Sequence, residues 1–315
     1  LGQKFVERTF GEEGKQRMLA MVDALEKSLA KDISELPWMT PATKEQAQVK
    51  LRAMARKIGY PEKWRDYSAL RVVRGEALAN SLAANEFSRA RSLRKIGKDT
   101  DPKEWHMTPP TVNAYYSPLE NNINFPAGIL QPPFFDRNAD DAVNFGGIGA
   151  VIGHEMTHGF DDQGRKYDAR GNVKGWWTAD DAREFEKRAQ CLVDQYSGYT
   201  AVGDVKLNGK LTLGENTADN GGVRVAYMAL LAYLAGRPEE KLGGFTAEQR
   251  FFLGYAQIWC QNTAEAQARL RAVTDPHSPG AYRVNGVVSN MPEFRNAFGC
   301  SEGQPMVRPN ACRVW

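Results

Sequence analysis

The sequence predicts a predominantly helical α+β fold with one small β-sheet. Apolar residues recur at helical spacing over much of the chain, as Met18, Val22 and Leu25 illustrate. Only two stretches, residues 111–116 and 122–125, have the composition of strands. Because the chain has 315 residues, we expect one large domain or two unequal ones.

The N-terminal part is expected to form three helices. The first contains the apolar positions named above. Thr40 followed by Pro41 is a typical helix start, and we expect this second helix to continue to the turn signal at Gly59. The third is expected over residues 76–96, with Gly97 as its terminator.

The rest of the chain alternates between strand, loop and helix signals. A turn at residues 117–120 separates the two strands, and prolines exclude regular structure from Pro126 to about residue 140. The tail from Pro276 is rich in Gly and Pro and contains only short apolar pieces. Further helices are expected over residues 142–160, 178–197, 217–235 and 246–264.

Composition excludes several classes of protein. The net charge is +3 with no basic block, so nucleic acid is not expected as a partner. No apolar run is long enough to span a bilayer. The chain starts at Leu1 like an interior stretch of a longer protein, so an anchor or export signal upstream is compatible with it.

The chain contains four cysteines, and none belongs to a C-x-x-C pair. This argues against a zinc–thiolate or thioredoxin-like site. We expect disulfides in an exported protein, with buried free thiols as the alternative. Spacing leaves the pairing open among Cys191, Cys260, Cys300 and Cys312.

Residues 154–158 read His-Glu-Met-Thr-His, an H-E-x-x-H motif. On a helix, His154 and His158 lie one turn apart on the same face, so both imidazoles can bind one ion. Glu155 then lies close enough to accept a proton from a metal-bound water. The alternative is a chance match, but two of the four His residues of the chain are in this motif.

A catalytic zinc ion takes three protein ligands and keeps one position open. The metzincin continuation is absent, because Asp161 and Gly164 stand where it requires Gly and His. We therefore expect the third ligand to be Glu215, at the start of an apolar helix. Asp219, one turn later, would accept the free N–H of a ligating His. The alternative is that both are first-turn acids favoured by the helix dipole.

His277 and Arg283 lie in a stretch that contains Gly and Pro. His277 suits stabilisation of an oxyanion, and Arg283 suits a clamp on a substrate carbonyl or carboxylate. For both residues, solvent-facing roles are the alternative. Asn113 on the first predicted strand suits pairing with an extended peptide, and an ordinary edge strand is the alternative.

Several long segments resemble the neprilysin and endothelin-converting-enzyme family of zinc endopeptidases, which are gluzincins. Together they extend over nearly the whole chain. They are residues 112–116 (VNAYY), 124–135 (NFPAGILQPPFF), 146–149 (GGIG), 151–162 (VIGHEMTHGFDD), 214–222 (GENTADNGG), 277–280 (HSPG) and 312–315 (CRVW).

The resemblance implies a role for each site residue and one zinc ion per chain. The implied zinc ligands are His154, His158 and Glu215. The implied catalytic residues are Glu155 as general base, Asp219 as support of a ligating His, and His277 as stabiliser of the transition state. The peptide backbone would be bound by Asn113, Ala114 and Arg283. The peptide would be cut on the amino side of a hydrophobic residue. The pocket for that residue would be formed by Ile129, Phe134, Val151, Ile258 and Trp259. Without the resemblance, these five residues would be assigned to the core.

The resemblance also implies a thermolysin-like catalytic domain and a helical cap domain that encloses a cavity. Residues 1–60 would be closing helices of the cap, residues 61–75 a connector and residues 76–315 the catalytic domain. The chain resembles only the later half of the family. We therefore expect most of the cap, with its size filter and some substrate contacts, from a missing N-terminal half or a second chain.

By the same resemblance, Cys191 pairs with Cys312. Cys260 and Cys300 would pair with cysteines upstream and could hold the two parts together. The expected location is extracytoplasmic, whether secreted, periplasmic or as a membrane-anchored ectodomain.

We expect a zinc-dependent endopeptidase that cleaves small to medium peptides by Glu155-assisted attack of zinc-bound water. A peptide-binding module without turnover is the alternative from another class, but loss of Glu155 or of a zinc ligand would mark it, and none is lost. A hydrolase of non-peptide amides is a third possibility. Asn113, Ala114 and Arg283 favour a peptide backbone over it.

Overall fold

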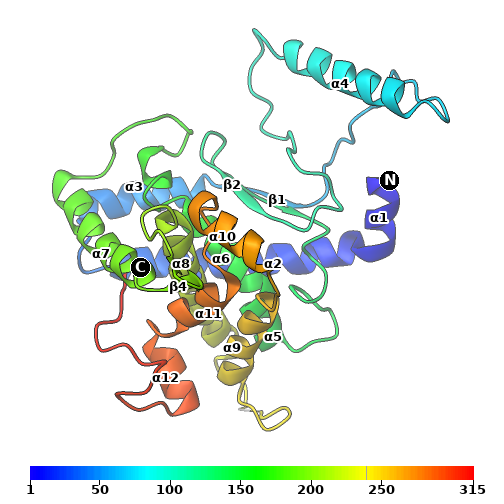
Figure 1. The fold of residues 1–315 in the computed structure, drawn as a ribbon. Coiled ribbons are helices and arrows are strands. Elements are labelled where there is room, and N and C mark those ends of the chain that lie inside the picture. Colours follow the sequence, from blue (N-terminus) through cyan, green and yellow to red (C-terminus); the bar gives the residue numbers. More distant parts are fainter. Residues whose placement is uncertain (239) are drawn as a thin grey trace.

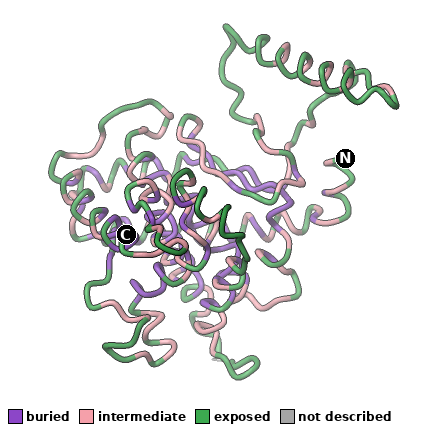
Figure 2. Tube along the Cα trace, viewed as in Figure 1, coloured by how far each residue is buried: buried purple, intermediate pink, exposed green. Residues whose placement is uncertain are grey.

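The computed structural model describes residues 1–238 and 240–315. Helices dominate it, and its described strands form one sheet of three strands and one of two, which confirms the predicted fold class (Figure 1). The core extends through the middle of the body, and exposed residues cover its outside (Figure 2). In the described part of the chain, no helix combines the length and the apolar character needed to cross a membrane.

The N-terminal helices are α1 (Gly2–Thr9), α2 (Gly11–Glu35) and α3 (Pro41–Arg52). Helix α2 buries the face that carries Met18, Val22 and Leu25. This face joins the same core as the central helices α6 (Ala150–His158) and α8 (Leu213–Leu234). Helix α3 begins at Pro41 as predicted.

The prediction that the second helix continues to Gly59 is wrong, because Ala55–Gly59 forms strand β1. Strand β1 pairs in parallel with β3 (Asn122–Pro126), and Ile58 lies opposite Phe125 in this register. The partner strand is far away in sequence, so local helix propensity contains no information about it.

Strand β3 is buried along its whole length between β1 and the edge strand β2 (Tyr115–Ser117). The strand predicted over residues 111–116 therefore starts only at Tyr115. Asn113 and Ala114 precede it as irregular backbone. The second small sheet joins β4 (Thr200–Val202) to β5 (Val205–Lys206).

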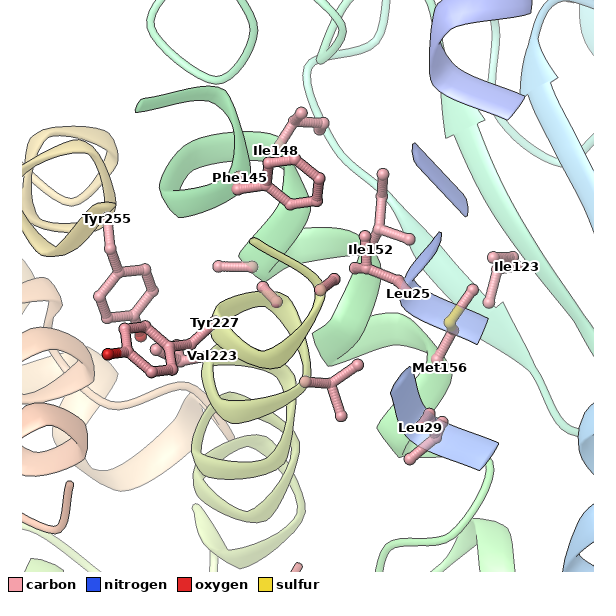
Figure 3. Packing of buried hydrophobic residues seen from close by; sticks show 14 of the residues in the cluster. Leu25, Leu29, Ile123, Phe145, Ile148, Ile152, Met156, Val223, Tyr227 and Tyr255 are labelled. Carbon is pink, nitrogen blue, oxygen red and sulfur yellow. The ribbon is translucent and has the colours of Figure 1, made fainter. Parts of the chain in front are cut away.

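The helix predicted over residues 142–160 is composed of three pieces. Helix α5 (Asp141–Asn144) leads into a π-helical turn (Phe145–Gly149) and then into α6 (Ala150–His158). Its apolar side chains Ile152 and Met156 lie toward Leu25 and Leu29 of α2 (Figure 3).

Helix α8 (Leu213–Leu234) packs directly on α6. A Cβ atom added to Gly153 would lie 2.4 Å from the carbonyl oxygen of Gly222, and one added to Gly222 would lie 2.3 Å from the backbone nitrogen of His154. The two backbones are therefore in contact, which only glycine permits at these positions.

The remaining helices cover this pair. The described ones are the 3-10 turn Gly164–Lys166, α7 (Ala179–Ser197), α9 (Ala247–Ile258), α10 (Glu265–Thr274), α11 (Gly280–Val288) and α12 (Pro292–Phe298).

Two predictions about this part need correction. Helix α9 ends at Ile258, six residues before the predicted position 264. The tail from Pro276 contains α11 and α12, although its Gly and Pro residues lower local helix propensity. One of these glycines is required by packing, because a Cβ atom on Gly286 would lie 2.6 Å from the hydroxyl oxygen of Tyr196.

A disulfide between Cys191 and Cys312 ties the C-terminal tail to α7, with the two Cα atoms 5.6 Å apart. This confirms the pairing implied by the resemblance. Beyond it, Trp315 is buried, and the indole N–H of Trp38 donates to the carbonyl of Val314 at 3.0 Å. In the described part of the chain, Cys260 and Cys300 form no disulfide.

Helix α4 (Ala77–Leu93) confirms the third predicted N-terminal helix, and it contains no buried residue. It stands away from the body on two extended connections (Figure 1). The division into residues 1–60, 61–75 and 76–315 stays a prediction, although α2 shares its core with α6 and α8.

The contact between α6 and α8 makes a testable prediction. Gly222→Ala forces a methyl group against the backbone of His154 and is expected to lower the free energy of unfolding by about 3 kcal/mol or more. Gly175→Ala is the control, because an added Cβ atom meets nothing within 4 Å there. Denaturant unfolding measures both, and equal stability of the two variants would contradict the close helix contact.

Candidate metal centre

The two imidazoles of the motif and the carboxylate of Glu215 meet between α6 and α8. The Nε2 atoms of His154 and His158 are 2.9 Å apart. Glu215 lies in the first turn of α8, with one oxygen 3.3 Å from Nε2 of His154 and the other 3.7 Å from Nε2 of His158. One possible ligand atom from each residue lies within 4.8 Å of those from the other two, so these three residues can hold one metal ion.

Each imidazole is oriented by a carboxylate on its other nitrogen. Nδ1 of His154 donates to Asp219 at 2.7 Å, and Nδ1 of His158 donates to Asp161 at 2.6 Å. Because ionised carboxylates only accept hydrogen bonds, both Nδ1 atoms carry protons, and the two Nε2 atoms face the same gap. A positive charge in this gap, whether a proton on Nε2 or a bound cation, removes the repulsion between two Nε2 lone pairs at this distance.

The electrostatics of the centre make the same demand. Burial disfavours the imidazolium, yet the carboxylates of Asp219 and Glu215 raise the pKa of His154 to about 10. Burial likewise opposes ionisation of Glu215, but the two motif imidazoles hold the pKa of this carboxyl well below its usual range. Among the residues that the structure describes, none forms a hydrogen bond with the buried Oε2 atom of Glu215. A cation between these groups satisfies the lone pairs, the carboxylate and this oxygen together.

The donor set fits a zinc ion. Two imidazole nitrogens and one carboxylate oxygen are the three protein ligands of a common class of catalytic zinc site. Both imidazoles carry the outer carboxylate that fixes the tautomer of zinc-binding histidines.

Glu155 follows His154 on α6 and is buried. It lies at the wall of a cavity that the three metal-binding residues also line. Burial raises the pKa of its carboxyl group, against the opposing influence of the two imidazoles. A raised pKa makes this carboxylate a better proton acceptor near neutral pH than an exposed glutamate.

Arg283 is buried and forms a forked ion pair with Asp219, at 2.6 Å and 2.7 Å. Its guanidinium also lies over the ring of Trp259, 3.9 Å from the centroid. Burial opposes ionisation of Asp219, but Arg283 and His154 lower its pKa below the ordinary value. The structure thus shows Arg283 holding the carboxylate that orients His154, a contact that the sequence did not predict.

His277 comes from the loop between α10 and α11, and its ring is 41 % exposed. Its Nε2 atom is 3.3 Å from Glu215, and its Nδ1 atom is 2.7 Å from Asp275. Asp275 is in turn held by Arg271 at 2.7 Å. The next residue, Ser278, donates to the side chain of Asn216 at 2.8 Å, which fixes this loop to the first turn of α8.

The centre opens into a cavity of about 870 Å³. Of the residues expected to bind substrate, Ile258 is buried behind the cavity wall and does not line it; Tyr255 of the same helix does. The others all line it, namely Asn113, Ala114, Ile129, Phe134, Val151, Trp259 and Arg283.

Three residues of the centre were missed in the sequence, namely Asp161, Arg271 and Asp275. Asp161 had a detectable signal, because it lies three residues after His158, and side chains at this spacing on one helical turn are neighbours. Asp275 lies two residues before His277, where an Asx-type turn places its carboxylate on the following backbone N–H.

The fold and this centre define the class of zinc metallopeptidases. Comparison with known proteins gives the family. The models described as Peptidase family M13 match residues 1–61 and residues 113–314. The chain belongs to this family.

Curated relatives support this placement. Endothelin-converting enzyme 1 of Homo sapiens is 42 % identical over 325 aligned residues, which cover 100 % of this chain and 42 % of that protein. An endothelin-converting enzyme homolog of Locusta migratoria is 41 % identical, with 100 % and 45 % covered. The chain therefore spans less than half the length of the curated relatives it matches.

Solved structures agree. The zinc metalloprotease Zmp1 of Mycobacterium tuberculosis, in complex with an inhibitor, superposes with a TM-score of 0.94 at 46 % identity, over 100 % of this chain and 48 % of that one. PepO of Lactobacillus rhamnosis gives a TM-score of 0.88 at 35 % identity, over 98 % of this chain and 48 % of that one.

The hydrogen bond from His158 to Asp161 makes a second prediction. Asp161→Asn weakens the acceptor that fixes the His158 tautomer and is expected to lower zinc affinity about 10- to 100-fold, measured by competition with a chromophoric chelator. Asp162→Asn is the matched control, because it removes the same charge from the neighbouring residue. The side chain of Asp162 accepts from Gln163 and not from an imidazole. An equal loss in both variants would show that only net charge matters.

Proposed function

We propose that this chain carries the catalytic centre of a zinc-dependent endopeptidase, with one zinc ion held by His154, His158 and Glu215. The observation that carries the proposal is the meeting of these three groups beside Glu155 at the wall of a large cavity. A bound zinc ion supplies Lewis acidity toward the peptide carbonyl and acidifies its water.

The chain's own residues then handle the proton. Glu155 accepts the proton of the attacking water, and its raised pKa suits this step. The same carboxyl group can pass the proton to the amine that leaves, because peptide cleavage releases a strongly basic nitrogen. Glu155 needs no metal contact for either role.

Two further groups suit stabilisation of the negative oxygen that develops on the carbonyl carbon. His277 reaches the centre from its loop with Nδ1 bonded to Asp275 and Nε2 facing Glu215, and in its doubly protonated form it can donate from Nε2 to this oxygen. Arg283 lines the cavity beside it, with part of its fork engaged by Asp219. Its remaining N–H groups suit a substrate carbonyl.

Substrate binding is proposed along the sheet edge and in an apolar pocket. Asn113 and Ala114 lie just before the edge strand β2, where an extended peptide can lie alongside the backbone. The cavity wall formed by Ile129, Phe134 and Val151 favours a hydrophobic side chain directly after the cleaved bond.

The upstream half of a longer protein, or a second chain, is proposed to complete the cavity for small to medium peptides. This agrees with a chain that covers 42 % of endothelin-converting enzyme 1. Cys260 and Cys300 are proposed to bond to that part, and the disulfide of α7 supports an extracytoplasmic location. Intact mass before and after reduction tests the link; thiols that are free in the isolated full protein would refute it.

The proposed reaction is tested by digesting a mixed peptide library and reading the products by mass spectrometry. We expect chelator-sensitive cuts before Phe, Leu, Ile or Val. Glu155→Gln is expected to reduce cutting by at least about 1,000-fold while zinc stays bound, because only the proton acceptor is lost.

The digest is repeated with the upstream half restored, so that an incomplete cavity is separated from an inactive centre. Absence of chelator-sensitive cutting in both preparations would contradict the proposed function. Cuts that persist in Glu155→Gln would contradict the role given to this residue.

A further inference from the structure

A buried lysine lies behind the metal centre. Lys50 belongs to the last turn of α3 and is only 1 % exposed. Its ammonium group donates to the carbonyl oxygens of Gly164 and Tyr167, both at 2.7 Å. A lone lysine is seldom buried so completely without a carboxylate partner, and a long apolar side chain would fill the same space at less cost of desolvation.

Aromatic rings enclose this ammonium group. The rings of Tyr116, Phe160 and Trp176 have centroids 5.7 to 5.8 Å from Nζ. Burial lowers the pKa of Lys50 to about 7, and the nearest charges that oppose this shift are Asp161 and Asp168. Amine and ammonium forms both have hydrogens for the two carbonyl groups, so the contacts hold in either form.

The backbone around Lys50 is also fixed. The side-chain amide of Asn121 donates to the backbone carbonyl of Lys50 at 3.1 Å and to that of Ala169 at 3.2 Å. The end of α3 is therefore tied to the chain that follows the H-E-x-x-H helix by contacts from both the side chain and the backbone of Lys50.

The segment that Lys50 holds is the one that orients a metal ligand. Asp161 accepts from the backbone N–H groups of Gln163 at 2.9 Å and Gly164 at 2.7 Å, and its other oxygen accepts from His158. Gly164 thus donates to Asp161 and accepts from Lys50. A Cβ atom added to Gly164 would lie 1.8 Å from the carbonyl of His158, so this turn is pressed against the end of α6.

We propose that Lys50 is a positioning residue for the metal ligand His158, acting through the turn at residues 161–167 and the carboxylate of Asp161. The inference rests on the proposed metal centre and deepens it. Lys50 anchors the far side of the turn, the turn fixes the Asp161 carboxylate, and the carboxylate fixes the ring of His158. A residue of the segment matched by one family model, residues 1–61, thereby controls the geometry of a metal site in the segment matched by the other, residues 113–314.

Lys50→Met tests this in the cobalt-substituted protein, because Met fills similar space without a donor. We expect the visible d–d spectrum of cobalt to change and the release of zinc to a chelator to accelerate about tenfold, as for loss of an outer partner of a metal ligand. These readouts require no peptidase activity.

Thr43→Val is the matched control. Thr43 is fully buried on the same helix and accepts from the backbone of Thr178 at the start of α7, and none of its hydrogen bonds to described residues goes to the turn. It is expected to lower thermal stability while the cobalt spectrum and the zinc release rate stay unchanged. Equal effects of Lys50→Met and Thr43→Val on spectrum and release would overturn the inference, as would no effect of Lys50→Met.

If Lys50→Met does not fold, the wild-type chain decides. Coupling is reciprocal, so zinc addition must alter the environment of the Lys50 side chain. In protein with 13C-labelled lysine, the Lys50 side-chain signals are expected to shift on zinc binding, while those of Lys57, buried against Glu120, stay in place. Unshifted Lys50 signals in a chain that binds zinc overturn the inference about Lys50 only. A wild-type chain that binds neither zinc nor cobalt overturns the proposed function as well.

Discussion

The backbone contact between α6 and α8 at Gly153 and Gly222 is the constraint on which the rest of the structure depends. Helix α6 carries both histidines, and α8 carries the two acids that complete their surroundings. Any side chain larger than hydrogen at the crossing would separate these helices and move Glu215 away from the imidazoles. The same contact lets α2 and α9 pack on the outer faces of the pair, so the core and the centre share one geometric requirement.

The centre itself depends on a balance of buried charge. Four carboxylates, those of Glu155, Asp161, Glu215 and Asp219, lie around two imidazoles, and Arg283 is the fixed cation among them. Buried charge is tolerated only when it is paired. Arg283 compensates Asp219, and a divalent metal ion held by His154, His158 and Glu215 would compensate two of the other three charges. The position of Arg283 is thus explained by its pairing with the buried carboxylate of Asp219.

Sequence reasoning succeeded where function depends on residues close together in the chain. The two histidines share one helical face, as their spacing predicted. Glu215 and Asp219 share a face of another helix, and they were predicted because the motif lacks a third ligand. It failed where the partner is remote. Strand β1 exists because β3 lies beside it, and helix α11 because Gly286 fits under Tyr196. The contact of Arg283 with Asp219 joins residues 64 positions apart and left no periodic signal in the sequence. The contact of Lys50 with the turn at Gly164 left no such signal either.

The tail fixed by the disulfide has a consequence for biosynthesis. The indole N–H of Trp38, shortly before helix α3, donates to the carbonyl of Val314. The ring of Trp315 packs against Phe160 and Phe185. Contacts between such remote segments form late, because the intervening chain must first be ordered. The aromatic packing of Phe160 and Phe185 therefore stays incomplete on the ribosome until residue 315 has been made. A nascent chain halted earlier would present an aromatic surface to chaperones instead of a finished centre.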